Sequence, residues 1–193
     1  MAEYLLDRIK ASLGETGIEP GTKAARRWIQ SKIKNLSASR TSLMRNIDRN
    51  VVRTIIGKMY FFFYTPKLND SLRYYDRFPL VLPIEQYDDG FLGLNLHYIH
   101  PKHRVILLDK FSNTLTDKNF DEDTRFRINY DYIRRASSAS EARPCIKRYL
   151  FENVKSRFLE INSDEWDIAS LLPVEDFFGA AKEIVFNESR KKY

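Results

Sequence analysis

The first third of the chain has the apolar spacing of short amphipathic helices. Apolar side chains recur three or four positions apart in three stretches: Leu5, Leu6, Ile9 and Leu13; Ala25, Trp28, Ile29, Ile33 and Leu36; Leu43, Met44, Ile47 and Val51. This period brings the side chains of each stretch to one helix face. Residues 14–21 contain three glycines and a proline, which indicates a linker, and Thr22 is placed to cap the second helix. We expect helices and linkers over residues 1–58.

From residue 59 the pattern changes to short apolar runs that are typical of strands. Residues 59–64 read Met-Tyr-Phe-Phe-Phe-Tyr, a run too short and too aromatic to favour a helix. The run at 78–84 contains two prolines, which confine a strand to an edge or a bulge. An Asp-Asp-Gly turn at 88–90 then precedes alternating leucines. We therefore expect an antiparallel sheet with strands at 59–65, 79–85 and 91–99.

The first of these strands is apolar on both faces. Alternation divides its aromatic side chains into two sets, Phe61 and Phe63 on one face and Tyr60, Phe62 and Tyr64 on the other. A strand of this kind needs a cover on each face. Because the predicted sheet is small, we expect part of the aromatic set to be covered only by a partner subunit.

The C-terminal half mixes helical signals with ambiguous ones. Pro101 stands where a helix begins, and apolar residues follow it at helical spacing. Residues 126–133 fit either a strand or a helix, and the acidic residues before them favour a helix. Residues 146–161 have the apolar spacing of an amphipathic helix.

These elements indicate an α+β fold, in which a small antiparallel sheet is packed with helices and preceded by a basic helical N-terminal arm. We place the arm at residues 1–58 and a globular α+β domain at residues 59–193.

The positive charge of the chain is concentrated in the arm. The formal net charge is +6, but residues 1–58 hold 12 Lys or Arg against 5 Asp or Glu, whereas residues 59–193 hold 20 against 21. We predict that the arm binds a partner through Lys23, Arg26, Arg27, Lys32, Lys34, Arg40, Arg45, Arg49 and Arg53. DNA, RNA or an acidic protein would satisfy such a surface, because charge complementarity depends on sign before identity. The alternative is a solvated helix face without a partner.

The residues that carry enzyme chemistry show no recognisable arrangement. Cys145 is the only cysteine, which excludes a disulfide framework or a multi-cysteine metal site within the chain. His97, His100 and His103 are close in sequence, but no regular period aims all three at one point, so we expect no metal site. No glycine-rich phosphate loop and no G-x-S-x-G nucleophile turn is present. We therefore expect no catalytic residue, no cofactor and no enzyme, and no membrane-spanning segment.

Five strings in residues 57–178 carry a family resemblance: GKMYFFFYTPK, YYDRFPLVLPI, GFLGLNLHYIHP, PCIKRYL and EWDIASLLPVEDF. With them the chain resembles small virion structural proteins, associated with the tail, baseplate or neck, of contractile-tailed T-even-like bacteriophages. The resemblance brings no catalytic or cofactor residues with it.

What the resemblance implies is assembly. It suggests a non-enzymatic structural subunit of the tail or baseplate, which docks neighbouring virion proteins through its core domain and its basic arm. Such a protein would be assembled in the host cytoplasm and located in the virion. The alternative is a nucleic-acid-binding virion protein at the neck or at the packaged DNA end, which would use the same arm.

Overall fold

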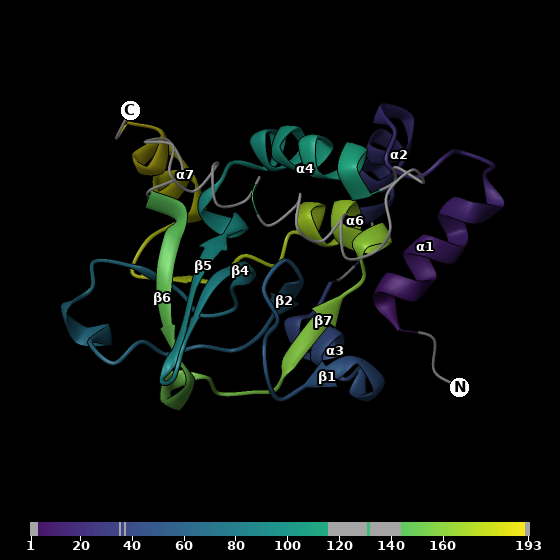
Figure 1. Cartoon of the computed structure of the whole chain (residues 1–193). Helices are drawn as coiled ribbons and strands as arrows, with labels where there is room; N and C mark the ends of the chain where they lie inside the picture. Colours follow the sequence, from purple (N-terminus) through teal and green to yellow (C-terminus); the bar gives the residue numbers. More distant parts are fainter. Residues whose placement is uncertain (1–3, 35, 37, 116–130, 132–143, 192–193) are drawn as a thin grey trace.

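An antiparallel sheet lies beside a layer of helices (Figure 1). The computed structural model describes residues 4–34, 36, 38–115, 131 and 144–191 of the 193-residue chain. The sheet consists of β1 (Asn50–Val51), β2 (Met59–Phe61), β4 (Leu80–Tyr87), β5 (Gly90–Asn95), β6 (Ile146–Leu150) and β7 (Phe158–Ile161). Their spatial order is β1-β7-β2-β4-β5-β6, and all neighbours are antiparallel. A separate ribbon pairs β3 (Tyr75–Asp76) with β8 (Phe177–Phe178).

The helices gather around a short central one. The α-helices are α1 (Leu5–Glu15), α2 (Lys23–Ile33), α3 (Arg40–Met44), α4 (Pro101–Leu115), α6 (Trp166–Leu171) and α7 (Lys182–Lys191). Short 3₁₀ turns are η1 (Ile47–Arg49), η2 (Asn69–Ser71), η3 (Leu96–Tyr98), η5 (Phe151–Asn153) and η6 (Ser163–Glu165). α6 contacts α1, α2 and α4 and so links the helical layer together (Figure 1). Among the described residues, no helix combines the length and apolar character that a bilayer span requires. The predicted α+β fold is confirmed.

The N-terminal helices share one hydrophobic core with the sheet. Buried side chains from the first three helices belong to the same cluster as those of β2, β4, β7 and α6; they are Leu6, Ile9, Leu13, Ala25, Ile29, Ile33 and Leu43. Each fully buried Leu or Ile contributes about 1.5–3 kcal/mol, so these contacts hold the helices firmly to the sheet. Residues 1–58 therefore differ from the rest of the chain in charge but join it in packing.

The other face of the sheet encloses a second, aromatic core. It is made of Tyr60, Phe62, Tyr64, Val81, Phe91, Tyr149 and Phe158, of which none is more than 7% exposed. The ring centroids of Phe91 on β5 and Phe158 on β7 are only 6.0 Å apart. These strands are three positions apart in the sheet, which would separate them by about 14 Å if the sheet were flat. The sheet therefore curls around the aromatic rings.

The curl of the sheet bears on the prediction of how the two faces of β2 are covered. The predicted alternation is confirmed, since Phe61 packs on the helix side and Phe62 in the aromatic core. The expected need for a partner subunit is wrong, because β6, β7 and their connection cover the aromatic face within one chain. A bridge between Tyr64 and Val154 joins this connection to the chain that follows β2.

Residues 146–161 form β6 and β7 and not the predicted helix. These residues form strands because pairing with distant strands outweighs the helical spacing of their apolar side chains. β6 lies so close to β5 that a Cβ at Gly90 would come within 1.9 Å of the Tyr149 carbonyl oxygen, which makes glycine necessary there. The Leu150 N–H also donates to the Tyr64 hydroxyl at 3.3 Å.

The helix expected over residues 43–51 is wrong beyond the end of α3, because η1 and the strand β1 follow it, whereas most of the other element predictions are confirmed. The strands expected at 59–65 and 79–85 correspond to β2 and β4, and the helix expected from Pro101 is α4. The strand expected at 91–99 ends at Asn95, whose side-chain oxygen accepts a hydrogen bond from the His97 N–H at 2.9 Å and starts η3. The helix favoured at 126–133 lies outside the described residues, except for Asp131, which is helical.

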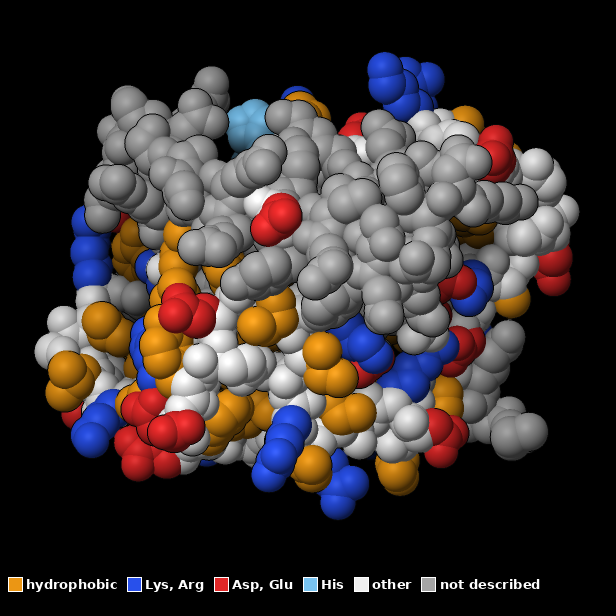
Figure 2. Space-filling model, viewed as in Figure 1, with side chains coloured by type: hydrophobic (Ala, Val, Ile, Leu, Met, Phe, Trp, Pro, Cys, Tyr) orange, Lys and Arg blue, Asp and Glu red, His pale blue; other side chains and the backbone are white. Residues whose placement is uncertain are grey.

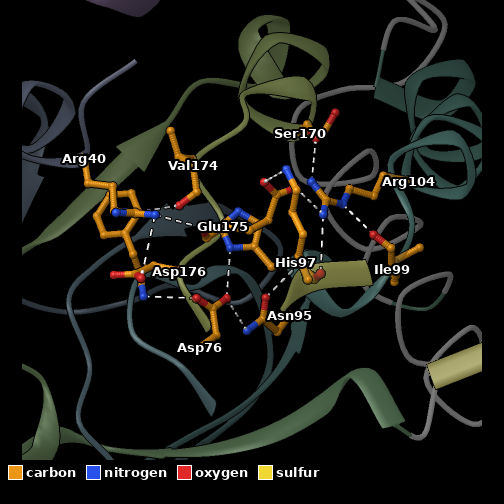
Figure 3. A network of polar contacts seen from close by, with 12 residues as sticks. Arg40, Asp76, Asn95, His97, Ile99, Arg104, Ser170, Val174, Glu175 and Asp176 are labelled. Atoms are coloured by element: carbon orange, nitrogen blue, oxygen red, sulfur yellow. Dashed lines mark hydrogen bonds and ion pairs between the residues drawn. The ribbon is translucent and has the colours of Figure 1, made fainter. Parts of the chain in front are cut away.

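A buried polar network fixes the segment that follows α6 (Figure 3). The Arg104 side chain is fully buried and donates to the carbonyl oxygens of Ile99 at 2.7 Å and Ser170 at 2.9 Å. Its guanidinium also pairs with Glu175 at 2.7 Å. From the other side, Arg40 donates to the carbonyl oxygens of Val174 at 2.9 Å and of Glu175 at 2.8 Å. Two arginines thus hold residues 170–175 in place.

A second part of the network lies beneath η3 (Figure 3). Asp76 is buried and contacts His97 Nδ1 at 2.9 Å and Asn95 Nδ2 at 3.0 Å.

Burial alone would raise the pKa of Glu175, but the positive charge of Arg104 and the neighbouring His97 outweigh it and hold this pKa below its ordinary value of 4.5. The Glu175 carboxylate therefore stabilises the fold above that pH.

The aromatic core gives the first testable expectation. Phe62→Ala should lower the free energy of unfolding by about 3–5 kcal/mol, because it empties a fully enclosed site. Phe178→Ala is the matched control, since that ring is 51% exposed and its loss should cost far less. Urea unfolding of both variants measures the difference. A small effect of Phe62→Ala on the isolated chain would mean that the aromatic face is not covered within one subunit.

The pH dependence of stability tests the Arg104–Glu175 pair. Glu175→Gln should cost about 3–5 kcal/mol at pH 7, because it leaves a buried guanidinium without its counter-charge. The pKa of Glu175 is lowered on folding, so the wild-type advantage is present above pH 4.5 and is lost as the pH falls below it. Glu152→Gln, which alters an exposed pair with Lys67, should have little effect at any pH. An advantage that persists unchanged at pH 3 contradicts the assignment.

Candidate nucleic-acid interface

α2 presents one buried face and one basic face. The Thr22 hydroxyl caps its start by accepting a hydrogen bond from the Ala25 N–H at 3.1 Å. The inward face carries the apolar residues that pack into the core. The outward face carries Lys23, Arg27, Gln30 and Lys34, all exposed. Their spacing of four, three and four residues aligns them along the helix. We call these four residues the basic stripe.

Arg26 lies on the inward side of α2 and is only 4% exposed. Its Nε contacts Asp167 Oδ2 on α6 at 2.9 Å, and its Nη1 pairs with Asp109 on α4. Burial alone would lower the pKa of Arg26, but the two carboxylates outweigh this and raise it above its ordinary value. The guanidinium stays charged and fixes α2 against both neighbouring helices.

Two more of the predicted partner-binding arginines are engaged within the chain. Arg49 pairs with Asp7 on α1 and with Glu165 in η6, each at 2.5 Å. Arg40 binds the carbonyl oxygens of residues 174 and 175, as described above. Arg26, Arg40 and Arg49 therefore stabilise the fold through internal partners.

The other six predicted residues are exposed and make no ion pair with another described residue: Lys23, Arg27, Lys32, Lys34, Arg45 and Arg53. Lys23, Arg27 and Lys34 lie together on the basic stripe. Lys32 lies on another flank of α2, with its Nζ 5.7 Å from the centroid of the Trp28 ring. Arg45 follows α3 and Arg53 follows β1, which are well separated from α2 in Figure 1. The structure thus brings three of the nine predicted residues together.

The surface view agrees with this placement. Figure 2 shows Lys and Arg side chains that protrude at the upper right, where α2 lies in Figure 1. α2 itself contains no acidic residue. Arg26 pairs with Asp109 of α4 and Asp167 of α6, and its single positive charge offsets one of these two negative charges. Lys23, Arg27 and Lys34 of the stripe are thus exposed cations that make no ion pair with another described residue.

An open groove of about 540 Å³ runs beside the stripe. Its lining comes from three separate segments and consists of Arg27, Gln30, Ser31, Ile33, Lys34, Leu36, Pro101, Leu171 and Pro173. Both charged residues in this lining are cations. The groove has no signature in the sequence, because only the fold brings the ends of α2, α4 and α6 together. The stripe itself was visible in the spacing of residues 23, 27, 30 and 34.

The histidines are arranged differently from a metal site. His97 is buried against Asp76, whereas His100 and His103 are exposed near the start of α4. Among the described residues, no group of three His, Cys, Asp or Glu side chains is placed to hold a metal ion. Cys145 is buried, and burial raises the pKa of its thiol to about 11, which makes it a poor nucleophile.

Comparison with known proteins identifies the family. The family model of the phage T4 terminal DNA protecting protein matches residues 5–193. Comparison with curated proteins and with solved structures found no match. The resemblance to T4-like phage proteins is confirmed, but the expected assignment to the tail or baseplate is wrong, because this family is described by protection of DNA termini. Since the match covers nearly the whole sequence, the chain belongs to the family of the phage T4 terminal DNA protecting protein.

Proposed function

We propose that this protein binds the ends of linear phage DNA and shields them through the basic stripe of α2. The observation that carries the proposal is the alignment of Lys23, Arg27 and Lys34 on one face of an acid-free helix, where they are exposed and make no ion pair with another described residue. The description of the family, terminal DNA protection, supports DNA as the anionic partner over an acidic protein.

The dimensions of the stripe suit a nucleic-acid backbone. Lys23 and Lys34 are eleven residues apart, which is about 16 Å along a helix at 1.5 Å per residue. This length corresponds to roughly five base steps of about 3.4 Å each. Three cations over that distance meet phosphates of one strand without any need for a particular base sequence. Such binding is sequence-independent and salt-sensitive.

Shielding a DNA end requires no chemistry from the protein. A bound subunit occupies the space that an exonuclease needs at the terminus, so occupancy alone protects. The proposal therefore assigns the chain no catalytic residue, no cofactor and no membrane partner. It places the protein in the virion or in the infected cell, wherever a packaged or injected DNA end is exposed.

Charge reversal tests the role of the stripe. The combined variant Lys23→Glu, Arg27→Glu and Lys34→Glu should bind a linear duplex at least tenfold more weakly. It should also lower the magnitude of the log–log salt slope by about 3, because each phosphate contact contributes about 0.9. Fluorescence anisotropy over a range of salt concentrations measures both quantities, and an exonuclease assay measures protection.

A matched control separates the stripe from net charge. Lys67, Lys155 and Arg157 are exposed and lie outside α2, and their reversal to Glu changes the net charge equally. This control should keep most of the affinity and protection. Equal losses in the two variants would show that total charge, and not the stripe, governs binding. Equal affinity of the wild type for circular and linear DNA would refute binding at ends.

A further inference from the structure

The groove beside the stripe combines three kinds of contact on one surface. Arg27 and Lys34 supply positive charge, and Gln30 and Ser31 supply hydrogen-bond donors and acceptors. The floor is apolar and is formed by Ile33, Leu36, Pro101, Leu171 and Pro173. None of the described residues that line it is acidic. The groove therefore suits a ligand with an anionic part, a polar edge and a flat apolar face.

The size of the groove limits what enters it. Its volume of about 540 Å³ lies within the range of roughly 300–1,000 Å³ that is typical of sites for small ligands. A DNA duplex is too large, since its major groove alone is about 12 Å wide. One or two nucleotides of a single strand are of suitable size.

The walls of the groove are held by buried ion pairs. Arg26 fixes α2 to Asp167 and Asp109, and so sets the wall that carries Arg27 and Lys34. Arg104 and Arg40 fix residues 170–175, which include the floor residues Leu171 and Pro173 (Figure 3). A site held in this way loses little conformational entropy when a ligand binds.

A paired base in the interior of a duplex has neither face available, because its neighbours stack on both. An unpaired nucleotide at a strand end offers its base faces, its base edge and its phosphate together. We propose that the groove binds the unpaired terminal nucleotides of one DNA strand, with phosphates at Arg27 and Lys34 and bases against the apolar floor. This inference rests on the proposed function and names the part of the DNA end that is recognised.

The experiment compares DNA molecules that differ only in their ends. A small circular duplex and linear forms cut from it with blunt ends, 5′ overhangs or 3′ overhangs compete for the full-length protein in an anisotropy assay. An overhang of one polarity should bind about tenfold more tightly than the blunt end. All three linear forms should bind more tightly than the circle.

Two variants change the groove without removing a cation. Pro173→Glu places a negative charge on the apolar floor at an exposed position, and Ser31→Leu adds bulk from the exposed side of α2. Each should reduce the preference for the overhang to less than threefold, while blunt-end binding stays within about twofold of the wild type. Pro20→Glu is the control, because Pro20 is exposed in the linker before α2 and lies outside the groove.

The outcomes separate this inference from the proposed function. If the circle competes as well as the linear forms, the proposed function fails. If linear DNA is preferred but overhangs and blunt ends bind equally, the groove does not take a strand end. The same conclusion follows if Pro173→Glu and Ser31→Leu both leave the overhang preference intact. Thermal unfolding of each variant by circular dichroism establishes that it is folded.

Discussion

The buried ion pairs of Arg26 determine where the external charge of this protein lies. Arg26 brings a positive charge to the junction of α2, α4 and α6, where Asp167 and Asp109 neutralise it. Removing one partner of a buried pair costs about 3–5 kcal/mol, because the remaining charge is left uncompensated. Since successive residues of a helix differ by about 100° in direction, an inward Arg26 obliges Arg27 to point outward. The same interaction offsets one of the two negative charges that Asp167 and Asp109 bring to this junction.

Much of the fold follows from local patterns in the sequence. The apolar spacing of residues 5–13 and 25–33 predicts α1 and α2, and the aromatic run after Gly57 predicts β2. The failure at 146–161 has a physical cause, since β6 and β7 depend on partners more than 50 residues away in β5 and β2. Spacing within one segment carries no information about such pairing. Glycine at position 90, which permits the close approach of β6, is informative only once the pairing is known.

The candidate site likewise has some features that the sequence predicts and others that depend on the tertiary structure. Charge asymmetry alone indicates an anionic partner for the N-terminal segment, because net charge is a property of composition. The charge asymmetry does not distinguish arginines that bind an external partner from arginines that stabilise the fold. Arg26 recurs with Ile29 and Ile33 at helical spacing, so its burial had a signal in the sequence. Arg40 and Arg49 had none, since their partners at 174–175 and at Asp7 and Glu165 are brought to them only by the tertiary structure. The groove likewise depends on three distant segments.

The proposed function requires that α2 contacts DNA at the end of the duplex. A photo-crosslinking amino acid introduced at Gln30, in the middle of the basic stripe, tests this directly on a linear duplex of defined length. If α2 binds the DNA end, crosslinks map to the last few nucleotides of the duplex. The same group introduced at Lys155, outside α2, should give few crosslinks. Crosslinks from position 30 that are spread evenly along the duplex, or that are no more frequent than those from position 155, would show that α2 does not bind the DNA end.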